Sequence, residues 1–385
     1  MKNVLIINQS SELYGADKAL LELIENFPEN FKPIVVLEHE GPLKEILLQK
    51  NIQVIKCPVI KLNRAVFTLS GFFKFGIDFF KGIHLLRKNI KNLEIDLIHS
   101  NAISVLVGAF YSFLYNKKHL WHVHEIIEHP KTIASFYPKL VYFFSDKIIF
   151  NSQASFNQFL KIKPIVKSKS VVVYNGQSRL IPVSSENDIN LTKNNLFHAE
   201  SKKKIIGLVG RISRWKGQII LLEAFYNLQK KHPDLHLVFV GSPPPNQDHF
   251  LHTLENRIKS LQLESKVTVV DFQKNIWPVY DALDIVIVPS IEPEPFGLVA
   301  TEGMLSSKPL IGSNHGGLSE IIVDGETGFL FEPKNQKDLE LKIEKLVLDS
   351  PLAEKFGKNG YKRVHEKFST KNYVSSIENI YKELS

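Results

Sequence analysis

The sequence has little of what stabilises small secreted domains or crosses membranes. Its 385 residues include one cysteine, Cys57, so no disulfide can form within the chain, and a reducing compartment is expected. No uninterrupted apolar run approaches the roughly 18 residues that span a bilayer. The apolar start Val4–Ile7 is too short for a secretory leader. These absences exclude a disulfide-stabilised scaffold and favour the cytoplasm.

Two binding signatures are missing as well. The glycine pattern G-x-G-x-x-G of dinucleotide-binding turns does not follow the strand expected at 205–209, which argues against a nicotinamide dehydrogenase. There is no Asp-x-Asp pair, and His119, His122, His124 and His129 lack the helical or fingered spacing of a zinc site. We therefore expect no cofactor and no metal ion.

What the sequence does contain is typical of a large globular protein with two α/β domains. Apolar residues make up 44% and charged residues 23%. Short, almost continuously apolar runs alternate with amphipathic helical segments, which is the pattern of parallel βαβ units with helices on both sheet faces. The fold class that we predict is α/β, with two Rossmann-like domains facing across a cleft.

The alternation is interrupted once, by a polar and turn-rich segment at 182–203. We expect an N-terminal, acceptor-side domain at 1–181, a linker at 182–203 and a second domain at 204–367. The net charge of +8 is concentrated in the first half, where residues 1–180 hold 23 Lys and Arg against 14 Asp and Glu.

A first group of chemically suited residues follows the strand expected at 205–209. Gly210 allows a ligand to approach the backbone closely, and Arg211 and Lys216 place two cations at the carboxyl end of that strand. Together with the amides of the helix that follows Gly217, they could bind a diphosphate. A basic turn with solvated charges is the alternative.

A second group follows the strand expected at 285–289. Glu294 precedes a helix that we expect to begin near Phe296, and Glu302 is placed about two turns inside it. Carboxylates accept hydrogen bonds from sugar and ribose hydroxyls, and free amides at 296–298 could meet phosphate or sugar oxygens. By themselves, two such glutamates are better explained as one acid that favours the helix dipole and one that is solvated.

Taken together, these motifs resemble glycosyltransferase family four. The resemblance rests on Gly210-Arg211-x4-Lys216-Gly217 and Glu294-Pro-Phe296-Gly297-x4-Glu302, and it continues through Gly316-Gly317 and Gly325-x2-Gly328. It implies the GT-B fold, transfer of a sugar with retention of configuration, no metal, and a final segment at 368–385 that returns to the N-terminal domain.

The resemblance also implies roles for single residues. Arg211 and Lys216 would hold the diphosphate, Glu294 the sugar hydroxyls, and Glu302 the ribose. The remaining expected donor contacts are backbone positions, namely Gly15, Gly210, Phe296 and Gly297. In the first half, His124 matches a family histidine that reaches the reacting sugar, although Glu125 replaces the usual aspartate.

The segment 61–91 is basic and rich in phenylalanine. This composition suits an anionic membrane surface or a bay for a lipid-linked acceptor, and no nucleic-acid motif accompanies it. Phenylalanines that face the core beneath a solvated basic surface are the alternative.

We therefore predict a cytoplasmic, peripherally membrane-associated glycosyltransferase that uses a nucleoside-diphosphate-sugar and a glycan or lipid-linked acceptor. The resemblance implies a part in the synthesis of cell-surface polysaccharide or glycolipid. The competing hypotheses are a nucleotide-sugar epimerase of the same fold and a non-catalytic protein that binds nucleotide-sugars.

Overall fold

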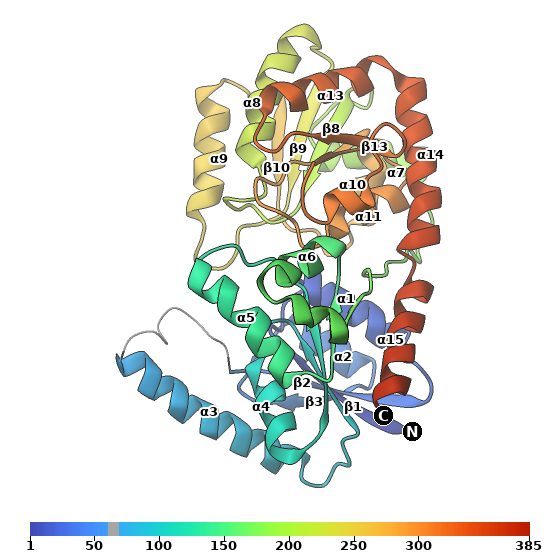
Figure 1. The fold of residues 1–385 in the computed structure, drawn as a ribbon. Coiled ribbons are helices and arrows are strands. Elements are labelled where there is room, and N and C mark those ends of the chain that lie inside the picture. The colour runs from blue at the N-terminus through green and yellow to red at the C-terminus, as the bar shows by residue number, and fades with distance from the viewer. Residues whose placement is uncertain (61–68) are drawn as a thin grey trace. The chain divides into compact units, whose positions relative to one another are not determined.

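The computed structural model describes residues 1–60 and 69–385 and divides into two compact units. Unit 1 comprises Met1–Gly176 together with Ser369–Ser385, and unit 2 comprises Gln177–Phe368. Each unit is a parallel sheet with helices on both faces (Figure 1). The predicted fold class of two Rossmann-like domains is confirmed for the two units taken individually.

Within the described residues, unit 1 contains a seven-stranded parallel sheet in the order β3-β2-β1-β4-β5-β6-β7. Its strands are β1 (Lys2–Asn8), β2 (Phe31–Leu37), β3 (Gln53–Lys56), β4 (Leu97–Asn101), β5 (Lys118–Val123), β6 (Lys147–Phe150) and β7 (Ser170–Val172). Its helices are α1 (Gly15–Glu25), α2 (Pro42–Gln49), α3 (Leu69–Ile90), α4 (Leu106–Tyr115), α5 (Lys131–Phe144), α6 (Gln153–Ile162), the 3₁₀ helix η2 (Pro164–Lys169) and α15 (Thr370–Leu384).

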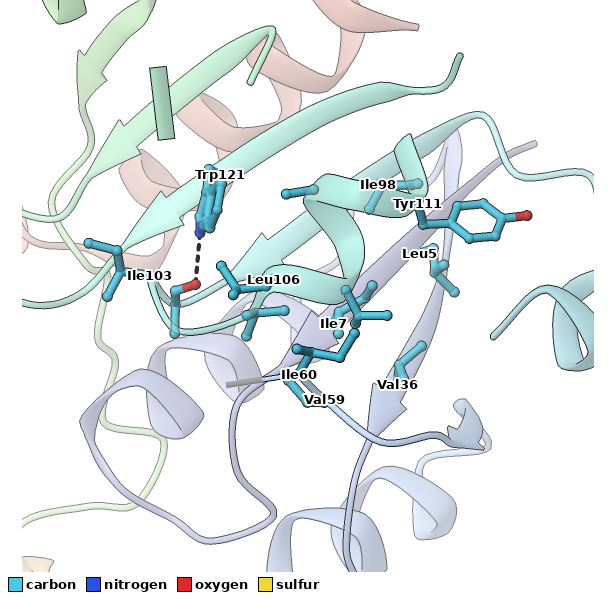
Figure 2. Close-up of a cluster of buried hydrophobic side chains, with 14 of the residues drawn as sticks. Leu5, Ile7, Val36, Val59, Ile60, Ile98, Ile103, Leu106, Tyr111 and Trp121 are labelled. Atoms are coloured by element: carbon cyan, nitrogen blue, oxygen red, sulfur yellow. Dashed lines mark hydrogen bonds between the residues drawn. The ribbon is translucent and has the colours of Figure 1, made fainter. Parts of the chain in front are cut away.

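The apolar strands of unit 1 bury side chains on both faces of the sheet. One face packs against α3, α4 and α5, and the other against α1, α2 and α15. Figure 2 shows part of the first layer, where the Trp121 indole donates a hydrogen bond of 2.8 Å to the carbonyl of Ala102. Cys57 is fully buried in this layer, and burial raises the pKa of its thiol to about 11, as expected for a packed residue.

Within the described residues, unit 2 contains a six-stranded parallel sheet in the order β10-β9-β8-β11-β12-β13. Its strands are β8 (Lys204–Val209), β9 (Leu235–Val240), β10 (Val267–Val270), β11 (Ile285–Val288), β12 (Leu310–Ser313) and β13 (Gly328–Phe331). Its helices are α7 (Glu186–Leu191), the π-helical turn η3 (Thr192–Leu196), α8 (Gln218–Lys231), α9 (His249–Ser260), α10 (Trp277–Ala282), α11 (Leu298–Leu305), α12 (Leu318–Ile321), α13 (Gln336–Leu348) and α14 (Ser350–Lys367).

Residues 182–203, for which the sequence predicts a linker, lie within unit 2. The side chain of Ser185 caps α7 by accepting a hydrogen bond from the amide of Asp188, at 3.2 Å. Just before this segment, Arg179 forms a buried, bidentate ion pair with Asp281, with Nη1–Oδ1 and Nη2–Oδ2 distances of 2.6 and 2.7 Å. From within the segment, the Ser184 amide donates to Asp281 at 2.8 Å, and Lys193 Nζ lies 3.3 Å from an Asp284 carboxylate oxygen. These two contacts attach the segment to unit 2, although its polar composition is typical of a linker.

Candidate functional site

In unit 2, the order of the strands reverses between β8 and β11. These two strands are neighbours, but the chain runs from β8 through β9 and β10 on one side and from β11 through β12 and β13 on the other. The loops that leave β8 and β11 therefore diverge, and in open α/β sheets ligands bind in the crevice at such a switch point. Both motifs of the sequence analysis lie in these two loops.

Two glycines with positive φ bring the loops into backbone contact. Gly217, at φ +80°, packs so tightly against the carbonyl of Pro289 that a Cβ atom would overlap it. The amide of Ile291 donates to the carbonyl of Trp215 at 2.8 Å. At Gly210, with φ +144°, a Cβ atom would come no closer than 4.0 Å to any residue other than its chain neighbours, and the residue at that distance is Lys216, through its side chain. The first loop is thus fixed to the second and stays open at its start.

The contact between the loops brings together two of the predicted site residues. Lys216 Nζ lies 2.6 Å from Glu294 Oε1, and both side chains are largely buried, at 12% and 6% exposed. Ser290 Oγ donates to the same carboxylate at 2.5 Å, and Lys216 also lies over the ring of Trp215. A cation and an acid that are 78 positions apart therefore form one charge-neutral pair at the switch point.

A third loop, after β12, contacts the backbone of Glu294. The amide of Gly317 donates to the Glu294 carbonyl at 2.7 Å, and Gly316, at φ +60°, packs against the Glu294 backbone. His315 Nε2 lies 2.8 Å from the Ser290 carbonyl, which can only accept, so this nitrogen carries the proton. Ser290 and His315 support the pair and were not singled out by the sequence analysis.

Phe296 and Gly297 form the start of α11. The Phe296 ring is buried and lies edge-on to Phe368, with the ring centres 5.7 Å apart. Gly297 has φ +116°, and a Cβ atom there would come within 2.8 Å of the Leu318 side chain. The helix can therefore begin directly behind Glu294, with its positive end at the same loop.

Glu302 lies about one turn inside α11 rather than two, because the helix begins at Leu298. It is buried, and it accepts hydrogen bonds from the Tyr280 hydroxyl at 2.7 Å and from Gln177 Nε2 at 3.1 Å. Burial and the adjacent Glu302 carboxylate raise the pKa of Tyr280 well above its usual value, so Tyr280 remains a donor. Tyr280 and Gln177 are further polar partners that the sequence analysis did not identify.

Arg211 follows Gly210 and is half-buried. Its carbonyl accepts a hydrogen bond of 2.8 Å from the Gln218 side chain, which ties the first turn of α8 to the loop. The structure thus brings together Lys216 and Glu294 directly and places Arg211 in the same loop as Lys216. Glu302 forms a separate polar group with Tyr280 and Gln177.

Unit 1 has an equivalent switch point between β1 and β4, and a chain of polar side chains lies there. Asp17 accepts from Asn8 Nδ2 at 2.7 Å, Asn101 Nδ2 donates to Asn8 Oδ1 at 2.7 Å, and Asn101 Oδ1 lies 2.9 Å from His124 Nε2. Because the Asp17 carboxylate can only accept, it orients both amides and places the proton of His124 on Nε2. Three strand ends are connected in this way.

His124 belongs to a buried group of aromatic side chains. Its ring lies 3.9 Å from that of His122, the His122 ring lies 5.6 Å from that of His99, and His99 Nδ1 lies 2.8 Å from the Tyr381 hydroxyl. Burial lowers the pKa of both His99 and His124 to about 3, so all of these rings are neutral near pH 7. Among the residues that the structure describes, His124 Nδ1 and both nitrogens of His122 are buried and have no hydrogen-bond partner.

Glu125 supports the loops around His124. One carboxylate oxygen accepts from the amides of Ile103 at 3.1 Å and His124 at 2.9 Å, and burial raises the pKa of this carboxyl to about 7.

Gly15 is exposed at the start of α1, where the preceding Tyr14 amide donates to Asp17 at 3.0 Å. In the described part of the chain, no three His, Cys, Asp or Glu side chains are grouped so as to hold a metal ion.

The membrane contact predicted for 61–91 falls partly outside the described residues, since 61–68 are not among them. From residue 69 onward the segment forms α3. None of the helices in the described ranges is both long enough and apolar enough to cross a bilayer.

Comparisons with known proteins point to one kind of enzyme for both units. Residues 15–177 match the family described as glycosyltransferase family 4, and residues 192–363 match glycosyl transferases group 1. An uncharacterized glycosyltransferase of Methanocaldococcus jannaschii is 30% identical over 346 residues, which cover 87% of this chain and 86% of the relative.

Two further proteins extend the similarity. An alpha-1,3/1,6-mannosyltransferase of Dictyostelium discoideum is 29% identical over 270 residues, which cover 62% of this chain and 61% of the relative. HepE of Anabaena, solved in complex with UDP and glucose, matches over 100% of both chains with 26% identity and a TM-score of 0.87.

Proposed function

Since this chain belongs to the family 4 glycosyltransferases, which have the GT-B fold, we propose that it transfers a sugar from a nucleoside-diphosphate-sugar to a glycan or lipid-linked acceptor with retention of configuration. The observation that carries this proposal is the buried pair of Lys216 and Glu294 at the β8–β11 switch point. A buried cation beside a carboxylate suits a ligand that carries both anionic phosphates and hydroxyl groups.

In this proposal, each partner of the pair meets a different part of the donor. Lys216 and Arg211 bind the diphosphate and stabilise the negative charge that develops as it leaves. Glu294 accepts hydrogen bonds from the sugar hydroxyls, while the positive end of α11 at Phe296 and Gly297 adds attraction for the phosphate oxygens. Glu302 accepts hydrogen bonds from the ribose. No step requires a metal ion.

The polar side chains of unit 1 have a supporting part in the proposal. Gly15 provides an exposed backbone position near the end of β1, and the neutral ring of His124 is held in a fixed orientation by Asn101. For retention, we propose that the acceptor attacks from the side of the departing diphosphate within a short-lived ion pair, since no carboxylate is assigned as a covalent nucleophile. The HepE complex makes a UDP-sugar the first donor to test.

The proposal is tested by adding a panel of nucleoside-diphosphate-sugars to the full chain, with UDP-glucose first. We expect a donor to raise the melting temperature and its sugar to appear on an acceptor with the anomeric configuration unchanged, as read by NMR. Lys216→Ala should lower the transfer rate by about 10²-fold or more, because it removes a preorganised charge from the leaving group.

Arg214→Ala is the matched control, since Arg214 lies in the same loop but is 65% exposed and pairs with Glu292. Transfer that survives in Lys216→Ala as fully as in Arg214→Ala would overturn the assignment. Conversion of the donor sugar into its epimer, without transfer to an acceptor, would instead identify an epimerase.

A further inference from the structure

The helices α3, α4 and α5 cover one face of the unit 1 sheet and carry large aromatic side chains on their outer surface. Phe80 on α3 is 73% exposed, Phe113 on α4 is 63% exposed, and Phe143 on α5 is 65% exposed. The three helices pack side by side in unit 1 (Figure 1). Packing of the unit 1 core does not require phenylalanines that are mostly exposed on three adjacent helices.

These three rings are connected by an unbroken series of ring contacts. Phe80 touches Phe79, Phe79 touches Phe110 and Phe110 touches Phe144, with centres 5.4, 4.8 and 4.7 Å apart. Phe144 in turn touches both Phe113 and Phe143, at 5.5 and 4.9 Å. The exposed rings are therefore the outer members of one aromatic cluster, and they belong to a single continuous surface.

The charges around the cluster have one predominant sign. The three helices contain six cations, Lys74, Lys81, Arg87, Lys88, Lys131 and Lys139, and one acid, Asp78. All six cations are exposed, and within the described part of the chain the five lysines form no ion pair. On α3, Lys74, Ile77, Lys81 and Lys88 follow one face at helical spacing, opposite the buried Ile83, Leu86 and Ile90.

From this combination we infer that the surface formed by Phe80, Phe113, Phe143 and the surrounding lysines, which we name the aromatic-basic face, docks the enzyme on an anionic lipid bilayer. Aromatic rings enter the interfacial zone while lysine ammonium groups remain among the headgroups, where their attraction depends on anionic lipid. A second copy of this chain fits less well, because a two-fold contact would press the lysines against one another.

Docking in this way leaves the carboxyl edge of the unit 1 sheet uncovered. Phe113 and Phe143 lie in the last turns of α4 and α5, and in a parallel βαβ unit the end of the helix lies at the amino edge of the sheet. His124 and Asn101 lie at the opposite, carboxyl edge. The inference extends the membrane contact predicted for 61–91 to α4 and α5, and it does not depend on the identity of the donor or acceptor.

The test is sedimentation of the full chain with phosphatidylcholine vesicles that either contain or lack phosphatidylglycerol. We expect binding to the anionic vesicles only, and we expect it to weaken as the ionic strength rises from about 0.05 to 0.5 M. Replacing the three rings together, by Phe80→Ser, Phe113→Ser and Phe143→Ser, should reduce partitioning by about tenfold or more.

The serine variants and a set of lysine variants each have a matched control in unit 2, which separates a specific effect on docking from a general effect of the substitutions. Leu341→Ser and Leu348→Ser remove exposed apolar side chains from α13 of unit 2 and should leave binding unchanged. Lys81→Gln, Lys88→Gln and Lys139→Gln leave the rings in place and should abolish the preference for phosphatidylglycerol, whereas Lys358→Gln and Lys362→Gln on α14 should not.

The inference is overturned if the wild-type chain ignores anionic vesicles at low salt or if the three serine substitutions leave binding unchanged. It is also overturned if sedimentation shows a dimer that these substitutions dissociate. Because vesicle binding is measured without donor or acceptor, it can fail while the proposed transfer activity stands, and the reverse also holds.

Discussion

At the scale of single residues, the feature of interest is a lysine whose charge is already neutralised before any ligand arrives. Lys216 and Glu294 are both nearly buried, so each depends on the other to offset the loss of hydration. Under the proposed function, a donor diphosphate therefore has to compete with Glu294 for Lys216, while the donor sugar offers hydroxyl groups to the released carboxylate. The diphosphate and the sugar are both needed to replace the contact that Lys216 and Glu294 make with each other.

This competition gives a prediction for Glu294→Gln. The amide keeps the shape but removes the negative charge, so Lys216 is left as a buried cation without a counter-ion. We expect the affinity for the free nucleoside diphosphate to rise about tenfold, while the transfer rate falls about 10²-fold because the carboxylate no longer orients the sugar. Calorimetric titration and a transfer assay measure the two effects.

The control for this variant is Glu292→Gln, which alters the exposed pair with Arg214 and should change neither quantity. A weaker affinity for the diphosphate in Glu294→Gln would show that Glu294 holds Lys216 in position rather than competing for it.

Single residues also show where sequence reasoning succeeds and fails. Lys216 and Glu294 could be expected to lie near each other because each is in the loop that follows an apolar strand, and the ends of adjacent parallel strands meet. Ser290, His315 and Tyr280 could not be found in this way. They act by holding other side chains, and a serine, histidine or tyrosine in a loop or helix carries no pattern that reveals its partner.

At the scale of elements, loop conformation is decided by glycines whose backbone no other residue adopts easily. Gly217 combines φ +80° with close packing against Pro289, whereas Gly325 has a similar φ of +74° and open space around it. Comparing Gly217 with Gly325 therefore separates the effect of the backbone angle on stability from the effect of the packing contact.

We predict that Gly217→Ala destabilises unit 2 clearly more than Gly325→Ala. At Gly325 only the left-handed angle is penalised, at about 1 kcal/mol. At Gly217 the methyl group also separates the loops after β8 and β11, which should bring the total to about 3 kcal/mol or more. Urea unfolding of the two variants gives the comparison, and equal losses would mean that the loop contact is easily relaxed.

The strands were the most predictable elements. Buried parallel strands are continuous apolar runs, and those expected at 205–209 and 285–289 are observed at Lys204–Val209 and Ile285–Val288. The sequence does not predict β13, with the short sequence Gly-Phe-Leu-Phe, and it predicts a linker at 182–203, which lies within unit 2. The helix α7 of that segment is stabilised by a local cap, and the Ser184 amide donates to the distant Asp281, neither of which follows from polarity alone.

At the scale of the whole molecule, stability should depend on pH through buried histidines. Burial lowers the pKa of His99 and His124 to about 3 and that of His119 to about 4, and lowers that of His122 strongly as well. Unfolded histidines bind protons below about pH 6.5, so the unfolded state gains protons there that the folded state does not. The free energy of unfolding therefore falls as the pH falls below 6.5.

Each histidine that takes up a proton on unfolding contributes up to about 1.4 kcal/mol per pH unit to this fall. Burial raises the pKa of Glu125 to about 7, so this carboxyl acts in the opposite direction. Its contribution to the free energy of unfolding grows as the pH falls from 7 towards 4.5. Burial also lowers the pKa of His236 to about 4 and raises that of Asp17. With five such histidines against two such acids, we predict a net loss of stability between about pH 6.5 and 5.

Urea unfolding across this range measures the effect. His99→Gln keeps a partner for Tyr381 and should flatten the dependence, whereas the exposed His252→Gln should not. Stability that stays constant down to about pH 5 would contradict the prediction.

The two units are also linked by the order of the chain, because α15 belongs to unit 1 although unit 2 precedes it in sequence. Ile377 of α15 is fully buried in the core of unit 1. We predict that Ile377→Ala lowers the stability of unit 1 by about 2–5 kcal/mol and leaves unit 2 unchanged. Hydrogen exchange should show loss of protection in β1 and β4 but not in β8 and β11.

Val364→Ala, in the adjacent helix α14 of unit 2, is the matched control. It should reduce hydrogen-exchange protection in β8 and β11 but not in β1 and β4. Loss of protection in both units after either substitution would show that they unfold together.

The placement of α15 also determines when unit 1 can finish folding during synthesis on the ribosome. Tyr373, Ile377 and Tyr381, which close one face of its sheet, emerge only after all of unit 2 has been translated. Until then, the first 176 residues expose an apolar surface over β1 and β4. A nascent chain of this kind needs protection from aggregation for most of its translation, while unit 2, which is continuous in sequence, can fold first.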